Sequence, residues 1–264
     1  MHIATWNVNS LSVRLPQVLA WLQANPVTAL GLQELKLTDD KFPHDAFEQA
    51  GYHSVCFGQK TYNGVAIVSR VPVRDVVRNI PGLDDAQARV IAATLDMPDG
   101  PLRLVNCYFV NGQAPGSEKF AYKLQWLAAL HGWLAGELRA HPRLALVGDF
   151  NVAPQDRDSF DPVGLKDTIH HTQEERAHFQ QLLDLGLVDA FRQFEQPDKS
   201  FSWWDYRMLG FQKNRGLRID HILVSQALLG GLSSCRIDRA PRKNPQPSDH
   251  APVVASWAEE LLIQ

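Results

Sequence analysis

Val147-Gly148-Asp149-Phe150-Asn151 is the stretch that indicates how this 264-residue chain folds. It continues the apolar run Leu144-Ala145-Leu146, which is typical of a buried strand, and a break at Pro154 follows it. Asp149 and Asn151 lie two positions apart, so on an extended chain their side chains point the same way. Asp and Asn are depleted in strands and common in turns. The stretch by itself fits a simple turn as well as a polar site at the exit of a central strand.

Apolar periodicity along the rest of the chain predicts alternating strands and helices. We expect strands at residues 2–9, 27–32, 52–57, 64–69, 90–95, 102–109, 143–147, 217–225, 235–239 and 253–257. We expect helices at residues 15–25, 45–50, 117–139 and 174–185. The two halves of the chain share this plan, which predicts an α/β four-layer sandwich of two stacked mixed β-sheets flanked by helices. No linker separates two units, so a single domain over residues 1–264 is expected.

Composition is that of an ordinary soluble enzyme, with 45% hydrophobic and 21% charged residues. No apolar run approaches the roughly 18 residues that a membrane helix needs, and the N-terminus lacks the pattern of a signal peptide. Three widely spaced cysteines suggest neither a disulfide framework nor a zinc site, which favours the cytoplasm. The net charge of −3 argues weakly against nucleic acid as a partner, since total charge hides its distribution. Short basic runs at 213–218 and 239–243 fit either a solvated face or a DNA contact, and for the second run the solvated loop is the favoured interpretation.

Polar residues follow several predicted strands at the same end. They are Asn7, Glu34, Tyr108, Asp149, Asn151, Asp220, Asp249 and His250. Taken singly, each has an ordinary alternative, such as a helix cap for Asn7, a turn for Asp249 or sheet packing for Tyr108. Their recurrence at one end of the strands favours a shared site. Asp220, between Ile219 and Ile222, needs a partner because a buried carboxylate is costly, and His250 or a cation could supply it.

These candidates carry carboxylates, amides and one imidazole, with no thiolate. Such hard ligands favour Mg²⁺ or Mn²⁺ over Zn²⁺. Mg²⁺ commonly binds one or two carboxylates beside a substrate phosphate, so a phosphate-bearing substrate is expected.

Seven segments together resemble the exonuclease III family of DNA-repair nucleases. They are residues 5–10 (TWNVNS), 32–36 (LQELK), 63–67 (NGVAI), 148–151 (GDFN), 202–207 (SWWDYR), 214–222 (NRGLRIDHI) and 248–253 (SDHAPV). The match runs in order from near residue 1 to near residue 257. The second-last and third-last segments are specific to this branch, whereas the others occur across the wider superfamily. The resemblance implies the DNase I-like form of the sandwich.

The resemblance also implies a Mg²⁺ site, in which Mn²⁺ substitutes. Glu34 would hold the ion with Asn7 and Asp249 nearby. The full set of candidate ligands is Asn7, Glu34, Asp149, Asn151, Asp249 and His250.

Catalytic roles follow from the same resemblance. Asp149 would orient or deprotonate the attacking water, and Asn151 would hold a phosphate oxygen or the nucleophile. Tyr108 would contact the phosphate or assist the leaving group. His250, oriented by Asp220, would stabilise charge on the phosphoryl group, because the pairing fixes the tautomer of the ring and keeps it charged.

The implied partner is double-stranded DNA with abasic sites or 3′ ends, bound by a monomer. Trp203 and Trp204 form an exposed-looking aromatic pair that would line the pocket for an abasic or terminal sugar, although core packing is the alternative. Candidate phosphate or groove contacts are Arg89, Asn111, Lys213 and Arg215. Abasic-site cleavage, 3′→5′ exonuclease activity and removal of 3′ blocking groups are the expected activities.

Two features depart from the family pattern. Met208 and Leu209 are bulkier than the residues expected after Tyr206-Arg207. His170 and His171 lie in a segment that would be unusual beside DNA, where they are either a surface loop or a source of bulk that favours 3′ ends over internal abasic sites. Alternative functions are a superfamily phosphatase on a non-DNA ester, a DNA-binding module without catalysis, and an enzyme that also attacks RNA.

Overall fold

Two parallel strand pairs form the centre of the molecule in the computed structural model, which describes residues 1–258. β1 (His2–Asn7) pairs with β2 (Ala29–Gln33), and β7 (Leu102–Tyr108) pairs with β8 (Leu144–Asp149). Parallel neighbours need a crossover connection, and a helix supplies it in both cases. The two halves of the chain therefore repeat one plan, as the sequence predicted.

Each parallel pair lies inside a six-stranded mixed sheet. The first sheet has the order β13 (Leu232–Ile237), β14 (Val253–Trp257), β1, β2, β4 (Val65–Ser69) and β3 (His53–Phe57). The second has the order β5 (Val73–Arg78), β6 (Val90–Leu95), β7, β8, β12 (Asp220–Ser225) and β9 (Leu187–Asp189). A short ribbon is formed by β10 (Trp203–Trp204) and β11 (Gly216–Leu217).

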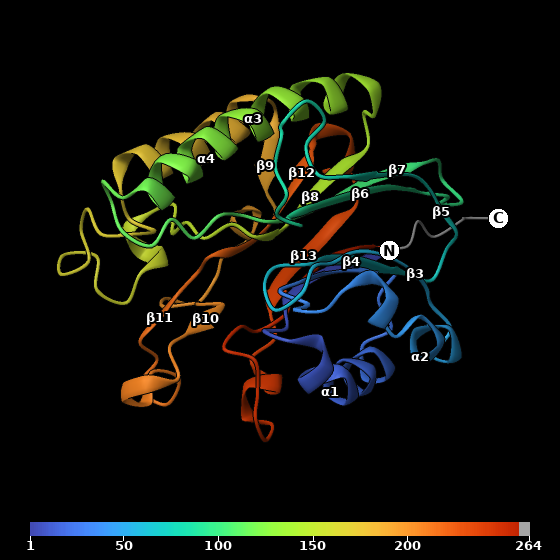
Figure 1. The fold of residues 1–264 in the computed structure, drawn as a ribbon, viewed down its shortest axis with the longest axis horizontal. Helices are drawn as coiled ribbons and strands as arrows, with labels where there is room; N and C mark the ends of the chain where they lie inside the picture. Colours follow the sequence, from blue (N-terminus) through green and yellow to red (C-terminus); the bar gives the residue numbers. More distant parts are fainter. Residues whose placement is uncertain (259–264) are drawn as a thin grey trace.

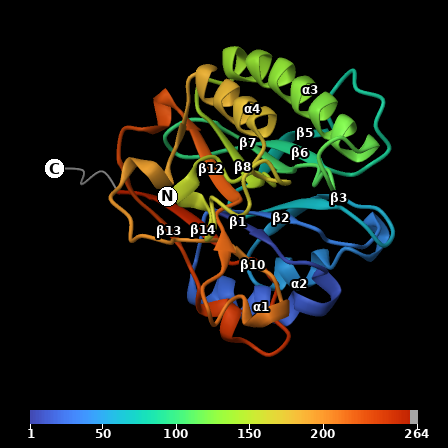
Figure 2. The same cartoon turned by 90° about the vertical axis from the view of Figure 1, so that its left-hand side faces the viewer.

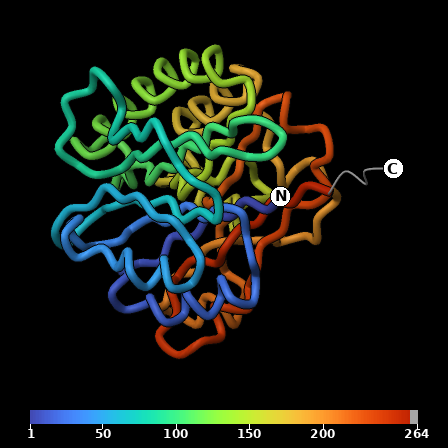
Figure 3. Tube along the Cα trace, turned by 90° about the vertical axis from the view of Figure 1, so that its right-hand side faces the viewer, coloured from blue at the N-terminus to red at the C-terminus, as the bar shows by residue number. Residues whose placement is uncertain are grey.

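Helices cover the outer faces of both sheets (Figures 1 and 2). α1 (Leu11–Ala24) and α2 (His44–Gln49) pack on the first sheet, and α3 (Glu118–Ala140) and α4 (Gln173–Asp184) pack on the second. α3 begins where the Ser117 hydroxyl accepts a hydrogen bond from the Phe120 amide, a standard N-cap. The result is the predicted four-layer α/β sandwich. In Figure 3 the blue N-terminal part of the trace lies in one half and the green middle part in the other.

A largely apolar core fills the space between the sheets, with buried side chains from both, such as Ile3 and Val147. One polar bridge crosses it. Asn106 donates from Nδ2 to the carbonyl oxygens of Leu32 and Ala66 in the opposite sheet, and its Oδ1 accepts from Gln33 at 2.7 Å. The bridge ties the sheets together beside the strand ends.

Gly148 brings β8 close to β7 just before Asp149. It has a φ of 151°, and a Cβ built on it would lie 1.9 Å from the carbonyl oxygen of Cys107. Only glycine fits such an approach, which explains the glycine between Val147 and Asp149.

Some element predictions need correction. β5 and β9 were not predicted, since β5 is half-exposed and β9 has three residues. The strand expected over 217–225 is two strands, because the chain leaves β11 after Leu217 to enter the second sheet at Asp220. Within residues 1–258 no helix is long and apolar enough to cross a membrane. The domain predicted over 1–264 includes residues 259–264, which lie outside the described residues.

Candidate active site

The ends of the two parallel strand pairs meet at one edge of the sandwich. Asn7 ends β1, Glu34 directly follows β2, Tyr108 ends β7 and Asp149 ends β8. The carboxyl ends of parallel strands are a common place for ligand sites, and here the stacking of two sheets brings four such ends together.

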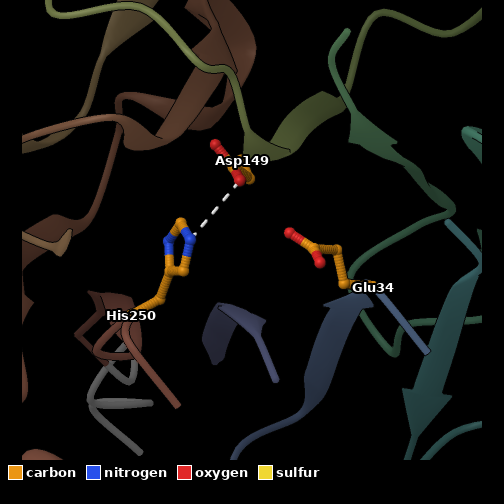
Figure 4. Close-up of side chains that lie close together, drawn as sticks. All are labelled: Glu34, Asp149 and His250. Carbon is orange, nitrogen blue, oxygen red and sulfur yellow. Dashed lines mark ion pairs between the residues drawn. The ribbon is translucent and has the colours of Figure 1, made fainter. Parts of the chain in front are cut away.

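Glu34, Asp149 and His250 form a compact group at this edge (Figure 4). One ligand atom from each lies within 4.8 Å of the others. His250 reaches the group from the segment before β14, and its Nε2 lies 3.6 Å from Asp149 Oδ2. Two carboxylates and an imidazole in this arrangement could hold a divalent cation.

Asn7 links the two carboxylates of the group. Its Nδ2 donates to Glu34 Oε1 and to Asp149 Oδ2, both at 2.9 Å. Its Oδ1 accepts from the Asn9 amide at 3.0 Å, which fixes the orientation of the side chain. In this orientation a donor faces the carboxylates, so Asn7 would ligate a metal through oxygen only after its amide turns.

His250 pairs with Asp220 as the sequence predicted. His250 Nδ1 donates to Asp220 Oδ2 at 2.8 Å, and Ser202 Oγ donates to the same oxygen at 2.7 Å. Burial alone would lower the pKa of His250, but the carboxylates of Asp220 and Asp149 outweigh it and raise the pKa above its usual range. Burial raises the pKa of Asp149, against the lowering effect of His250. The ring is thus a charged donor with Nε2 directed toward Asp149.

Tyr108 lies beside the two carboxylates and beneath Arg89, whose guanidinium carbon is 5.1 Å from the centre of its ring. Burial, followed by the charges of Glu34 and Asp149, raises the pKa of Tyr108 well above its ordinary value. The hydroxyl is therefore a protonated donor.

Asn151 is held by one hydrogen bond from its main chain and one from its side chain. Its amide donates to Asp149 Oδ1 at 3.0 Å, and its Nδ2 donates to the Phe109 carbonyl at 2.9 Å. Asn151 has a φ of 50°, and Glu34 a φ of 52°. Non-glycine residues in this region are strained, and such strain clusters at functional sites.

Asp249 lies apart from the compact group. Its Oδ1 accepts from Asn9 Nδ2 at 3.1 Å and its Oδ2 accepts from Trp203 Nε1 at 3.0 Å. The carboxylate thus connects the strand ends to the aromatic ribbon of β10.

A cavity of about 730 Å³ opens beside Trp203. Most of the surface that lines it is apolar, and the apolar side chains are those of Phe160, Leu165, Ile169, Trp203, Met208 and Leu217. His170 and His171 also line it, so the structure places both specificity candidates at one cavity. The His171 ring is buried and bonded to Ser159 Oγ at 2.9 Å. The His170 ring donates from Nδ1 to the Asn151 carbonyl at 2.7 Å, and burial lowers its pKa to about 4.

Three of the four predicted phosphate or groove contacts line two cavities. Arg215 lines the apolar cavity, with its guanidinium carbon 5.0 Å from the centre of the Phe160 ring. Arg89 and Asn111 line a second cavity of about 710 Å³, together with the exposed Tyr62. Lys213 is exposed on the loop between β10 and β11. Asn111 Nδ2 is 3.4 Å from Asn151 Oδ1, which places the second cavity next to the site as well.

Two expectations for this surface are wrong. Trp204 is not exposed: its side chain is buried, donates from Nε1 to Asn214 Oδ1 at 3.0 Å and packs edge-on against Phe211. The run 239–243 is not a plain solvated loop, because Arg242 is buried, stacks over Trp204 and donates to the Ser248 carbonyl at 2.8 Å. Tertiary packing of two loops covers both side chains.

Sequence reasoning also missed residues that support the site. Lys36 Nζ lies 3.5 Å from Glu34 Oε2 and donates to Asn9 Oδ1 at 2.7 Å. Ser248 Oγ donates to the Asn7 carbonyl at 2.6 Å. Lys36 and Asn9 could have been found, since each follows a strand-end residue by two positions.

The fold and the site together define an α/β protein of two stacked sheets with a carboxylate–histidine centre at one edge. More particularly, the chain belongs to the endonuclease/exonuclease/phosphatase family, whose family model matches residues 4–250. The resemblance to the exonuclease III family is confirmed.

Several relatives span the whole chain. It is 37% identical over 272 residues to exodeoxyribonuclease III of Haemophilus influenzae, covering 98% of this chain and 99% of that protein. It is similar to the 3′ phosphatase NExo from Neisseria, solved with a product DNA hairpin, with a TM-score of 0.95, 51% identity and coverage of 98% and 100%. It is also similar to an AP endonuclease from Archaeoglobus fulgidus, with a TM-score of 0.92, 34% identity and the same coverage.

Proposed function

We propose that this protein is a Mg²⁺-dependent DNA-repair phosphodiesterase of the exonuclease III type that acts on 3′ ends and abasic sites and prefers 3′ ends. The observation that carries the proposal is the group of Glu34, Asp149 and His250, backed by Asp220, beside an apolar cavity. The relatives that span the whole chain include an exodeoxyribonuclease III and a 3′ phosphatase solved with product DNA, and both names describe hydrolysis of phosphate esters of DNA.

The residues present fit a hard divalent cation, because the cluster offers carboxylate oxygens and no thiolate. Glu34 and Asp149 would hold Mg²⁺, with Asn7, Asn151 and Asp249 as further candidate ligands, and Mn²⁺ would substitute. His250, also a candidate ligand from the sequence, would not bind the ion while both of its ring nitrogens carry protons. The bound ion would offset negative charge on the phosphate.

The side chains of the chain supply the remaining chemistry. Asp149 takes the proton of the water that attacks phosphorus, as the P–O bond to the leaving group breaks in line. His250 donates from Nε2 to a phosphoryl oxygen, with its orientation and positive charge maintained by Asp220. Asn151 orients the phosphate or the water. Tyr108, held protonated, donates to the phosphate or the leaving oxygen.

DNA would lie across both cavities as double-stranded substrate of a monomeric enzyme. Trp203 would contact the terminal sugar in the apolar cavity, and Trp204 would support that wall from behind. Arg89, Asn111, Lys213 and Arg215 would contact phosphates, which makes binding weaken as salt rises. The free cysteines agree with action in a reducing compartment such as the cytoplasm.

The test uses one labelled duplex with a central abasic analogue and one with a 3′-phosphate, each with Mg²⁺ and with chelator. We expect metal-dependent processing of both, faster on the 3′-phosphate. Equal or faster incision of the abasic duplex contradicts the preference. Tight binding without cleavage contradicts the catalytic proposal and leaves a DNA-binding module.

His170 is the residue that we propose sets the preference, because it lines the cavity and is partly exposed there, whereas His171 is buried. His170→Gly should raise abasic incision relative to removal of the 3′-phosphate. His171→Gly is the matched comparison at the same cavity and should change the ratio less. Unchanged ratios in both variants would refute a role for this segment.

A further inference from the structure

A buried ion pair lies beneath the active site and belongs to none of the groups described above. Lys123 on α3 and Glu175 at the start of α4 form it, and neither side chain is exposed to solvent. Lys123 occupies the inward-facing stripe of α3, between the buried Phe120 and Leu127. A charge pair removed from water is costly to bury, so its presence in an otherwise apolar stripe needs a reason beyond stability.

All three N–H donors of the lysine are used in hydrogen bonds to residues around the site. Lys123 Nζ donates to Glu175 Oε1, to the Asn151 carbonyl at 2.8 Å and to the Asn111 carbonyl at 3.1 Å. Gly112 lets the loop close over the lysine stem, because a Cβ there would lie 2.9 Å from Lys123 Cδ. One side chain therefore anchors two loops that carry a candidate catalytic residue and a candidate DNA contact.

The glutamate anchors a third segment. Glu175 Oε1 accepts from the His170 amide at 3.1 Å, and Oε2 accepts from the amide and the hydroxyl of Thr172 at 3.1 and 2.8 Å. The His170 ring returns to the Asn151 carbonyl, which already accepts from Lys123. The ion pair, Asn151 and His170 thus form one closed network.

Asn151 and His170 both need such support. Their φ angles of 50° and 71° lie in the left-handed region, which Asn and His adopt more readily than most residues and in which contacts with the surrounding chain hold them here. The Asn151 carbonyl accepts from both Lys123 and His170. It belongs to the same residue whose amide bonds Asp149 Oδ1 and whose side chain bonds the Phe109 carbonyl.

We propose that the Lys123–Glu175 pair is a positioning element that holds Asn151 for catalysis and His170 at the apolar cavity, and so couples the rate of hydrolysis to the choice of DNA end. This inference rests on the proposed function. Lys123 and Glu175 touch no substrate and act through the two residues that they hold.

The competing role is simple attachment of α3 to α4, and a double substitution separates the two. Lys123→Met with Glu175→Gln removes both charges at similar volume. Either substitution alone leaves a buried group unpaired and should lower the melting temperature strongly, whereas the double variant should recover much of that loss. Its activity should not recover, because the Asn111 and Asn151 carbonyls both lose the hydrogen bond from Lys123 and the Asn151 carbonyl keeps only the one from His170.

The expected kinetic result for the double variant is a kcat for 3′-phosphate removal at least 10-fold below wild type, with KM changed less than 3-fold. Its ratio of abasic incision to 3′-phosphate removal should rise in the direction of His170→Gly, and adding His170→Gly should raise it no further. Recovery of wild-type kcat together with stability would overturn the proposal and leave a purely structural pair.

Arg103→Met with Glu137→Gln is the matched control. That pair also includes a residue of α3, which it joins to the second sheet with a distance of 2.8 Å. It is largely buried and lies at the opposite end of β7 from Tyr108. It should change stability while kcat and the substrate ratio stay as in wild type.

Hydrogen–deuterium exchange gives a readout that does not depend on activity. The double variant should exchange faster in peptides that contain residues 109–112, 150–153 and 168–172, and the control variant should not. Unchanged exchange there would overturn the positioning role even if the proposed DNA activity failed. If His170→Gly alone leaves the ratio unchanged while the double variant loses kcat, the 3′-end preference fails and the positioning of Asn151 stands. Should the double variant not fold, Glu175→Gln alone, which keeps shape and one acceptor oxygen, is measured in the same way.

Discussion

At the scale of single residues, the site depends on which atom of each polar side chain is already bonded. His250 gives Nδ1 to Asp220, so only Nε2 is free for the reaction. Asn7 gives its amide hydrogens to two carboxylates, which separates them without a positive charge. The residue types alone would allow other pairings, and the hydrogen bonds select one.

Asp220→Asn tests the pairing. An amide does not stabilise the positive charge of the His250 ring as a carboxylate does, so kcat for 3′-phosphate removal should fall by about 10²–10⁴-fold while the fold is kept. The measurement is steady-state kinetics with a thermal melt of each variant. Asp198→Asn, on an exposed loop, is the control and should keep wild-type kcat. Wild-type kcat in Asp220→Asn would show that His250 is oriented by other contacts.

At the scale of secondary structure, the site is made where strands stop. Glu34 and Asn151 follow their strands at positive φ, so the chain turns sharply and each side chain stays at the edge. Gly148 allows the same edge to form on β8 by letting the strand approach β7. The strands bring these residues to the edge of the sandwich, and the turns after the strands set the direction of their side chains.

Gly148→Ala should therefore be severe. Its Cβ would meet the Cys107 carbonyl at 1.9 Å and the φ of 151° disfavours alanine, so a loss of more than about 2 kcal/mol is expected from urea unfolding. Gly132→Ala on α3 is the comparison, since nothing lies within 4 Å of its Cβ. It should stabilise by about 0.5–1 kcal/mol through helix propensity. Equal effects would contradict the close approach of β8 to β7.

At the scale of the whole molecule, a second buried charge network contacts the chain at Val152, directly after the candidate catalytic residue Asn151. Arg218 is fully buried and bonds Asp158 and Asp189 at 2.7 and 2.8 Å. It also donates to His221 Nδ1 at 3.0 Å, and His221 Nε2 donates to the Val152 carbonyl at 3.0 Å. His221 is therefore neutral with one tautomer.

This network predicts a pH dependence of stability. Burial first, and then Arg218, lowers the pKa of His221 to about 4, from an ordinary value of 6.5. Between these values the unfolded chain binds a proton at His221 that the folded chain does not. His221 by itself should therefore lower the free energy of unfolding by about 3 kcal/mol as the pH drops from 6.5 to 4, and His170, whose pKa is also lowered to about 4, should add to this fall. Urea unfolding at several pH values measures it. His221→Gln should show a shallower slope, and equal slopes would contradict the neutral state of His221.

The shared core predicts one cooperative unit. Buried side chains from both sheets pack together in one layer, among them Ile3, Val65, Ile91 and Val147. Thermal unfolding followed by circular dichroism and by tryptophan fluorescence should therefore give one midpoint, and the calorimetric and van 't Hoff enthalpies should agree. Two separate transitions would contradict the single domain expected over residues 1–264.

The order of strands and helices could be predicted because their signals are local. Apolar periodicity marks α3 and β8, and the polar residues at strand exits mark the site, since Asp149 and Glu34 follow buried strands directly. The pairing of Asp220 with His250 was also predictable, because a carboxylate flanked by apolar residues needs a partner. The sequence by itself thus determined the class of fold and the residues gathered at the edge.

Only the tertiary structure decided what lies between segments far apart in the chain. Trp204 is buried because two loops close over it, and Lys123 meets Glu175 because α3 packs beside α4. Neither contact has a local signal, since each depends on how separate elements are placed in space. The hydrogen-bond partners of His250 and Asn151 likewise depend on how separate segments pack together, and residue type alone does not determine them.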